Sequence, residues 1–243
     1  VATGRAFDRY QLLSAKALLG AIFFEDTRLG PEAMQRADQY ARIIAGSSWN
    51  AELLRAAGYD RVALILQGVD PTLFHPHNKG DGVPGRFLIF SGGKLEFRKG
   101  QDLVIKAVGQ FIARHPDALL VTAWRSPWES LAMTLNRAGV AEPLAADDHG
   151  RLDLASWAQR NGIPPENFLD LGLMTNFQLA VTLRQMDVAV FPNRAEGGTN
   201  LVAMESMACG VPVVLSRNTG HLDLIGEGNG DPRCLVLDDQ RRV

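Results

Sequence analysis

The feature that most constrains the fold is a repeated alternation of short apolar runs with amphipathic helical patterns. The apolar runs are predicted strands, because they are short and bounded by Gly, Pro and polar clusters. They are residues 21–24, 42–45, 62–66, 87–90, 118–123, 168–171, 188–191, 213–215 and 234–237. Residues 101–114 carry apolar side chains with a period near 3.6, which predicts a helix. Apolar strands separated by such helices indicate a mostly parallel sheet covered on both faces. We therefore predict an α/β fold with a doubly wound, Rossmann-like parallel sheet.

Composition excludes several classes of protein. The formal net charge is −2, so no excess of Lys and Arg is available to neutralise a phosphate backbone, and we expect no nucleic-acid partner. Only two cysteines occur, Cys209 and Cys234, which favours a reducing, cytoplasmic location over a disulfide scaffold. No apolar run is long enough to span a membrane. The apolar residues 17–24 precede Glu25 and Asp26, so they are predicted to form a buried strand.

A boundary is visible in residues 67–86, which are rich in Pro, Gly and polar residues and lack periodicity. We predict a domain tail at 1–66, an interdomain linker at 67–84 and a second domain at 85–243. The first residues resemble the end of a domain, so we expect the chain to be a fragment. Three tryptophans are expected to pack helices, and 147–150 to form an exposed loop. The tryptophans are Trp124, Trp128 and Trp157.

The first candidate site follows the predicted strand 87–90. The segment 91–100 holds glycines that let the backbone approach an anion, namely Gly92 and Gly93, and three cations, namely Lys94, Arg98 and Lys99. In an open α/β sheet, ligands bind beyond the carboxyl ends of the strands and near helix N-termini. Such a loop can hold a diphosphate. The alternative is a solvated charged turn, and the spacing of a Walker loop is absent.

The second candidate site follows the predicted strand 188–191. A Gly-rich loop with Glu196, Gly197 and Gly198 leads into an apolar helix that is predicted to begin near Thr199. Amides at that helix N-terminus can receive negative charge. The alternative for Glu196 is a solvated loop carboxylate. A buried Glu205, which is the only ionisable residue of the helix, needs a hydrogen-bonding partner. Either a ribose diol or an internal Arg or Lys would supply one.

Taken together, the two sites resemble the C-terminal domain of retaining GT-B glycosyltransferases, in the group 1 or family 4 type. The family motif Gly-Arg-Leu, three residues, Lys-Gly is matched by residues 93–100. A strand ending in Gly172, an Asp-Val strand at 187–188 and a Glu-to-Glu motif follow in order. The motif Ala-x-Gly-x-Pro-Val-Val is matched by 208–214. Upstream, 47–50 and 68–70 resemble the end of the N-terminal domain. The resemblance covers about residues 38–225.

The resemblance assigns a role to each matched residue. It implies that Lys94 and Lys99 hold the donor diphosphate and that Glu196 contacts the donor sugar. Glu205 would contact the ribose, and Leu173 and Met174 would lie beside the base. The supporting backbone amides belong to Gly198, Thr199, Asn200 and Leu201. Two departures from the family pattern stand out. A lysine replaces the usual arginine at position 94, and eight residues rather than seven separate the two glutamates.

The implied reaction transfers a sugar from a nucleoside-diphosphate sugar to an acceptor hydroxyl with retention, by stabilising the leaving diphosphate. The resemblance implies a hexosyltransferase in polysaccharide biosynthesis whose isolated fragment is inactive. The acceptor would be a glycan, a lipid or a protein, and peripheral membrane association of the full-length protein stays open. No cofactor or metal is expected, because the sequence lacks metal-ligand spacing. We expect His75 and His77 to be solvated and His221 to be a packing residue. A sugar-nucleotide epimerase, a phosphorylase and a non-catalytic nucleotide- or glycan-binding module are the alternatives.

Overall fold

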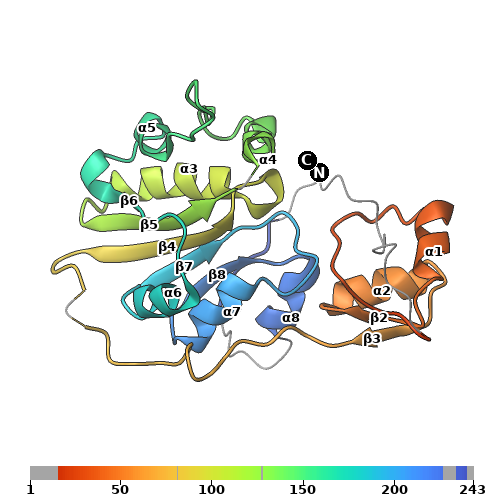
Figure 1. Cartoon of the computed structure of the whole chain (residues 1–243). Helices are drawn as coiled ribbons and strands as arrows, with labels where there is room; N and C mark the ends of the chain where they lie inside the picture. Colours follow the sequence, from red (N-terminus) through yellow and green to blue (C-terminus); the bar gives the residue numbers. More distant parts are fainter. Residues whose placement is uncertain (1–15, 81, 127, 227–233, 240–243) are drawn as a thin grey trace.

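The computed structural model describes residues 16–80, 82–126, 128–226 and 234–239, and these form two separate parallel sheets (Figure 1). The smaller sheet has the order β1-β2-β3, and two helices accompany it. Its elements are β1 (Leu19–Ile22), α1 (Pro31–Ala37), β2 (Arg42–Ala45), α2 (Ser48–Ala56) and β3 (Val62–Leu64).

The larger sheet has the order β6-β5-β4-β7-β8-β9, and every neighbouring pair is parallel. Its strands are β4 (Phe87–Lys94), β5 (Ala118–Arg125), β6 (Phe168–Asp170), β7 (Val188–Phe191), β8 (Val213–Ser216) and β9 (Leu235–Leu237). Helices α3 (Gln101–Ile112), α4 (Glu129–Ala132) and α5 (Leu154–Arg160) cover one face. Helices α6 (Asn176–Leu183), α7 (Leu201–Ala208) and α8 (Leu222–Ile225) cover the other face. The predicted doubly wound α/β class is confirmed.

The strand order places a topological switch point between β4 and β7. The chain runs outward from β4 through β5 to β6, and then returns to place β7 on the other side of β4. Helices leave the two strands toward opposite faces of the sheet at this point, which is the position at which open α/β sheets generally bind their ligands. Among the described residues, four short 3₁₀ helices occur in the connections. They are η1 (Phe97–Lys99), η2 (Met133–Ala138), η3 (Pro165–Asn167) and η4 (Thr219–His221).

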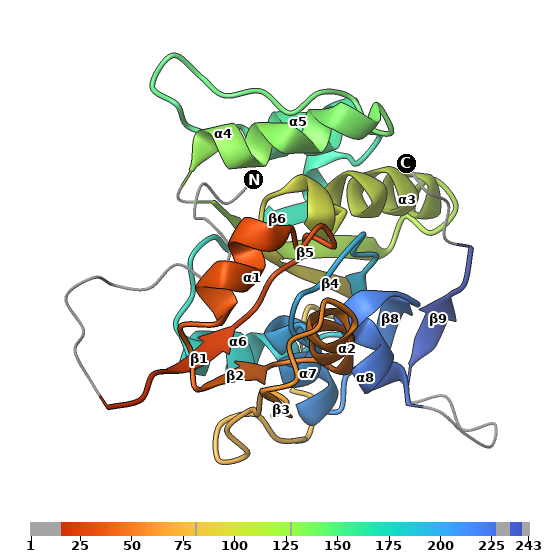
Figure 2. The same ribbon diagram turned by 90° about the vertical axis from the view of Figure 1, so that its right-hand side faces the viewer.

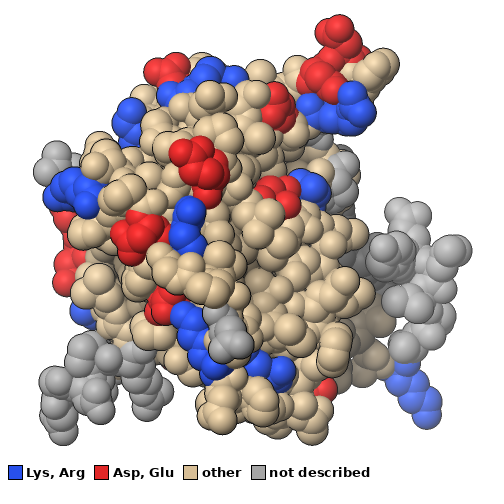
Figure 3. Space-filling model, turned by 90° about the vertical axis from the view of Figure 1, so that its left-hand side faces the viewer, with Lys and Arg blue, Asp and Glu red and all other residues tan. Residues whose placement is uncertain are grey.

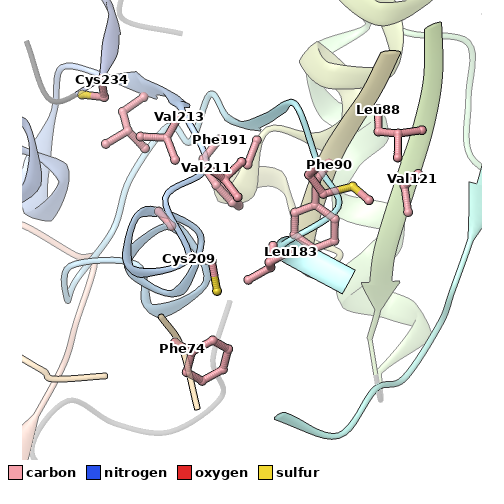
Figure 4. Packing of buried hydrophobic residues seen from close by; sticks show 14 of the residues in the cluster. Phe74, Leu88, Phe90, Val121, Leu183, Phe191, Cys209, Val211, Val213 and Cys234 are labelled. Atoms are coloured by element: carbon pink, nitrogen blue, oxygen red, sulfur yellow. The ribbon is translucent and has the colours of Figure 1, made fainter. Parts of the chain in front are cut away.

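Two apolar clusters hold the larger sheet, one on each face. The cluster on the α6–α8 face joins buried side chains of the strands to Leu183 and Cys209 of the helices (Figure 4). The cluster on the opposite face contains Trp124 and Trp157, whose ring centroids lie 5.9 Å apart. These two tryptophans pack helix against sheet as expected. The expectation was wrong for Trp128, which is 58% exposed.

The segment before β4 is firmly attached to the larger domain. Phe74 is buried beside Cys209 in the same apolar cluster. Arg184 of α6 donates hydrogen bonds to the carbonyl oxygens of Leu73 and His75 at 2.5 and 3.2 Å. The linker therefore lies along the α6–α7 face (Figure 1) rather than free in solvent.

The smaller sheet meets the larger domain through the N-terminus of α2. The Ser47 hydroxyl donates to the Gly197 carbonyl oxygen at 2.7 Å, and the Ser48 amide donates to a carboxylate oxygen of Asp223 at 2.8 Å. Helix α2 contacts η4, the turn that leads into α8, and Figure 2 shows the molecule from the side of the smaller sheet. The smaller sheet thus contacts the larger domain at the loop that carries the second candidate site.

Three further findings complete the description of the fold. The strand predicted at 21–24 lies instead at Leu19–Ile22 at one edge of its sheet, where Leu19 is 66% exposed, so the buried-strand prediction is wrong there. Within the described residues, no helix is both long and apolar enough to cross a membrane. Figure 3 shows one face on which basic and acidic side chains surround a broad uncharged area.

Candidate functional site

The two predicted loops meet at the switch point between β4 and β7. The amide of Arg194, after β7, donates to the carbonyl oxygen of Arg98 in η1 at 2.7 Å. Gly100 has a φ of +72°, and a Cβ added there would lie 2.4 Å from the carbonyl oxygen of Pro192. Only glycine fits this contact, because a side chain would be both strained and in collision with backbone. The two loops therefore form one unit.

An ion pair fixes the outer side of this unit. The Arg194 guanidinium donates two hydrogen bonds to the Asp102 carboxylate, at 2.8 and 2.7 Å, and lies 4.3 Å from the ring centroid of Phe97. Such a bidentate pair restricts both position and orientation. It links the first turn of α3 to the loop after β7.

The Glu196 carboxylate lies at the centre of the site. It is only 4% exposed and accepts hydrogen bonds from Lys99 and Asn193 on one oxygen and from Arg98 on the other, the last at 3.0 Å. Burial alone would raise the pKa of Glu196, but the charges of Lys99 and Arg98 outweigh it and hold this pKa below its ordinary value. Glu196 is therefore a fixed anion between two cations, which excludes the alternative of a solvated loop carboxylate.

Lys94 lies at the edge of this cluster. Its ammonium group is 3.5 Å from the Glu96 carboxylate and 5.4 Å from the ring centroid of Trp128. Its side chain is about one-third exposed. The structure thus brings Lys99 and Glu196 together directly, whereas Lys94 connects to them through Glu96 and Arg98.

Helix α7 begins one residue later than predicted. Asn200, with a φ of +68°, is the N-cap, and its side chain accepts from the Ala203 amide at 3.4 Å. Thr199 instead donates its hydroxyl to the sulfur of Met204. Asparagine suits this position because its short polar side chain tolerates a left-handed backbone. The N-cap assignment to Thr199 is therefore corrected to Asn200.

The loop before α7 directs its carbonyl oxygens away from the helix axis. The Gly220 amide donates to the Glu196 carbonyl oxygen at 3.0 Å, and Ser47 donates to that of Gly197. In the part of the chain that the structure describes, the amides of residues 198–201 donate no hydrogen bond to the protein. Free amides at a helix N-terminus are suited to an anion.

His221 is fully buried beneath this loop. It donates from Nδ1 to the Ser216 carbonyl oxygen at 3.1 Å and accepts at Nε2 from the Asn200 side chain at 3.0 Å. Burial lowers its pKa to about 4, so the ring is neutral at pH 7. His221 is the packing residue that the sequence predicts, and it also holds the N-cap of α7.

Glu205 is half-buried in α7 without a counter-ion. Within the described residues, its carboxylate has neither an ion pair nor a hydrogen bond to another side chain. Burial raises the pKa of Glu205 to about 7. No Arg or Lys among the described residues pairs with Glu205, so this alternative is excluded for them. The carboxylate is therefore available to a ligand.

The remaining predicted residues, Gly92, Gly93, Leu173 and Met174, differ widely in exposure. Gly92 is buried, and a Cβ there would press on Val202 of α7 at 3.0 Å; around Gly93 there is open space. Leu173 is 88% exposed, and with Met174 it lines a shallow groove of about 330 Å³ across α6. The position of this groove after β6 is where the resemblance places the base.

No cluster of three or more His, Cys, Asp or Glu side chains suited to a metal occurs among the described residues. His75 and His77 contact each other edge to face, with ring centroids 6.3 Å apart.

Comparison with known proteins identifies the family. The family model described as "Glycosyl transferases group 1" matches residues 77–236, which is more than half of the chain and includes both loops of the site. The chain belongs to this family. The resemblance inferred from the sequence motifs is thereby confirmed.

Individual relatives of this family agree. The chain is 31% identical over 192 residues to a D-inositol 3-phosphate glycosyltransferase of Pseudarthrobacter chlorophenolicus, covering 75% of the chain and 41% of the relative. It is 29% identical over 171 residues to the lipopolysaccharide core biosynthesis mannosyltransferase LpcC of Rhizobium leguminosarum, covering 68% of the chain and 43% of that relative. The chain thus spans less than half the length of these curated relatives.

A solved structure supports the same fold. Anabaena Alr3699/HepE, solved in complex with UDP and glucose, superposes with a TM-score of 0.67 at 19% identity, covering 91% of this chain and 57% of that one. At this identity the likeness shows the fold. HepE therefore shares the architecture described above over the part that superposes.

Sequence reasoning did not assign several polar residues of the site. Arg98 was noted only as one of three cations, and Asn193, Glu96 and Thr219 were not singled out. The Thr219 hydroxyl oxygen accepts a hydrogen bond from the Glu196 amide at 2.8 Å. The adjacency of Arg98 to Lys99 within the family motif was the available signal. The contacts of the others depend on tertiary folding.

Proposed function

We propose that this chain is the donor-binding half of a retaining hexosyltransferase, which transfers a sugar from a nucleoside-diphosphate sugar to an acceptor hydroxyl. The observation that carries the proposal is the juxtaposition of Lys99, Glu196 and the free amides before α7 at the switch point of the sheet. Cations close in space to amides that donate to no described residue suit a diphosphate.

The proposed mechanism is electrostatic. Breaking the bond between the sugar and the diphosphate places negative charge on the leaving phosphate oxygen. The amides of residues 198–201 are fixed by the surrounding fold, so they stabilise this charge without reorganising, and Lys99 adds its positive charge by turning from Glu196 to the phosphates. In this proposal these groups, rather than a divalent metal, stabilise the leaving group. Lys94 joins them by turning from Glu96 toward the phosphates.

The two glutamates would recognise the sugar rings of the donor. Glu196, held by cations on both oxygens, would accept hydrogen bonds from hydroxyl groups of the transferred hexose. Glu205 would accept from the ribose diol, which supplies the hydrogen-bond donors that the protein does not. The base would lie against Leu173 and Met174.

The relatives make the proposal chemically specific. HepE was solved with UDP and glucose, and LpcC of Rhizobium leguminosarum is described as a mannosyltransferase. We infer a hexose donor, retention of configuration, and a glycan, lipid or protein acceptor held by the N-terminal half of a longer protein. We place the protein in the cytoplasm, where nucleotide-sugars would be available. A GT-B site closes between two domains, so this chain alone should bind nucleotide yet turn over little.

Calorimetric titration with UDP, GDP and ADP tests the proposal. We expect one nucleotide to bind the parent chain and the Lys99→Ala variant to lose at least about tenfold in affinity, because a buried charged hydrogen bond is removed. Lys106→Ala, which removes the same charge from the outer side of α3, is the matched control and should bind as the parent does. Equal affinity of the parent and Lys99→Ala would refute the assignment of the diphosphate site.

A further inference from the structure

Arg98 occupies an unusual position among three carboxylates from separate segments of the chain. Its guanidinium lies 2.8 Å from Glu96, 3.0 Å from Glu196 and 3.4 Å from Glu25, which follows β1 in the smaller sheet. Its side chain is only 24% exposed. Burial disfavours its charge, but the carboxylates, Glu196 foremost, raise the pKa of Arg98 above its ordinary value.

The position of Arg98 is also fixed by the backbone. Its carbonyl oxygen accepts from the amide of Arg194 at 2.7 Å, and its guanidinium donates to the carbonyl oxygen of Ala195 at 3.4 Å. Arg98 therefore cannot move toward a ligand without breaking contacts on both loops.

Lys99 has no comparable set of constraints. Its ammonium group carries three donors, and among the described residues it is paired with one oxygen of Glu196. Asn193 shares that oxygen, while Arg98 holds the other one. Both cations thus pair with one carboxylate, and of the two Lys99 can exchange partners by breaking a single ion pair, whereas Arg98 would have to break three.

This arrangement has a consequence for donor binding. A diphosphate that attracts Lys99 draws it away from Glu196. If Lys99 were the only counter-ion, that step would leave a buried carboxylate unpaired, which is costly. Arg98 removes this cost because it stays on Glu196.

We propose that Arg98 is the permanent counter-ion of Glu196, which allows Lys99 to exchange from Glu196 to the donor diphosphate. Arg98 is then a positioning residue that acts through Glu196 and does not touch the phosphates, since both of its terminal nitrogens are already paired with carboxylates, Nη1 with Glu196 and Glu25 and Nη2 with Glu96. This inference rests on the proposed function, because it assumes that a diphosphate binds at Lys99.

A double-mutant cycle on nucleotide affinity tests the inference. UDP, GDP and ADP are titrated calorimetrically into the parent chain, Arg98→Met, Glu196→Gln and the double variant. We expect Arg98→Met to weaken binding about tenfold, within the range of couplings found for contacting residues. In the Glu196→Gln background, the same substitution should weaken binding by less than about threefold, because Lys99 is no longer retained by a charge.

Other outcomes would overturn the inference. A loss of the same factor in both backgrounds would show that Arg98 contacts the phosphates itself, and unchanged affinity of Arg98→Met would show that Lys99 needs no second cation. Arg114→Met, at the far end of α3, is the control for removing a positive charge. If Arg98→Met does not fold, Arg98→Lys replaces it, with an expected loss of about threefold to fivefold that likewise disappears with Glu196→Gln.

The cycle separates the two proposals. If Lys99→Ala binds as well as the parent, the proposed function fails, and the inference fails with it. If Lys99→Ala loses affinity while Arg98→Met keeps it, only the inference about Arg98 is refuted.

Discussion

Replacing Glu205 with glutamine should make the protein more stable at pH 8. The pKa of Glu205 is raised from 4.5 to about 7 by burial. The folded state therefore binds more protons than the unfolded state in this interval, so stability falls as the pH rises from about 4.5 to about 7. The carboxylate imposes its full cost above pH 7 and none below about pH 4.5. Glutamine keeps the shape and removes the charge.

The size of the effect follows from the shift. A pKa unit corresponds to about 1.4 kcal/mol, so the raised pKa sets an upper limit of roughly 3 kcal/mol. Because the side chain is only half-buried, solvent screening reduces this to about 1–2 kcal/mol. For a domain of this size, the midpoint of thermal unfolding should rise by about 3–6 °C at pH 8.

Thermal unfolding followed by circular dichroism at pH 5 and pH 8 measures this difference. We expect Glu205→Gln to exceed the parent at pH 8 and to approach it at pH 5, while Glu166→Gln, an exposed control in η3, changes neither value. The same Glu205→Gln variant should bind nucleotide more weakly at pH 8, because the ribose diol loses its charged acceptor. A Glu205→Gln protein that is less stable than the parent at pH 8 would show that the carboxylate has a cationic partner, and would refute the reasoning.

Three further substitutions test how the site is supported. Gly220→Ala should unfold the chain or cost more than about 3 kcal/mol by urea denaturation, since its Cβ would lie 1.6 Å from the carbonyl oxygen of Gly198; Gly30→Ala, which meets nothing within 4 Å, should be tolerated. The stability difference between the parent and His221→Gln should shift by about 2–3 kcal/mol against the parent as the pH falls from 6.5 to 4, because the folded pKa of His221 is about 4, below the ordinary 6.5, and the variant carries the same Glu205. A difference that does not change between pH 6.5 and 4 would contradict this. Phe74→Ala should lower the free energy of unfolding by about 3–5 kcal/mol, and a loss below 1 kcal/mol would show that the linker is not anchored in the core.

Much of the fold was predictable because local patterns and the global fold agree. The strands at 42–45 and 188–191 were predicted with their observed bounds, and the helix from 101 begins where its period begins. The first strand was misplaced because 17–24 is uniformly apolar, so periodicity does not fix its register. Trp128 was expected to pack, yet it lies in the connection after β5 and is 58% exposed, which composition does not reveal.

The site could be predicted only in part for a physical reason. Motif spacing predicted Lys99, Glu196 and Glu205 as site residues, and the structure brings Lys99 and Glu196 into contact. The partners of Glu196 depend on which strands are neighbours, and no local sequence pattern predicts the pairing of β4 with β7. The same limit concealed the role of His221 at the N-cap of α7, which requires the β8–α8 connection to fold beneath that helix.

The most direct test of the central claim is a crystal structure of this chain with UDP or GDP bound. The account predicts diphosphate oxygens about 3 Å from the ammonium group of Lys99 and from the amides of residues 199–201, with Arg98 still on Glu196. A nucleotide bound away from the carboxyl ends of β4 and β7, with Lys99 remaining on Glu196, would contradict it.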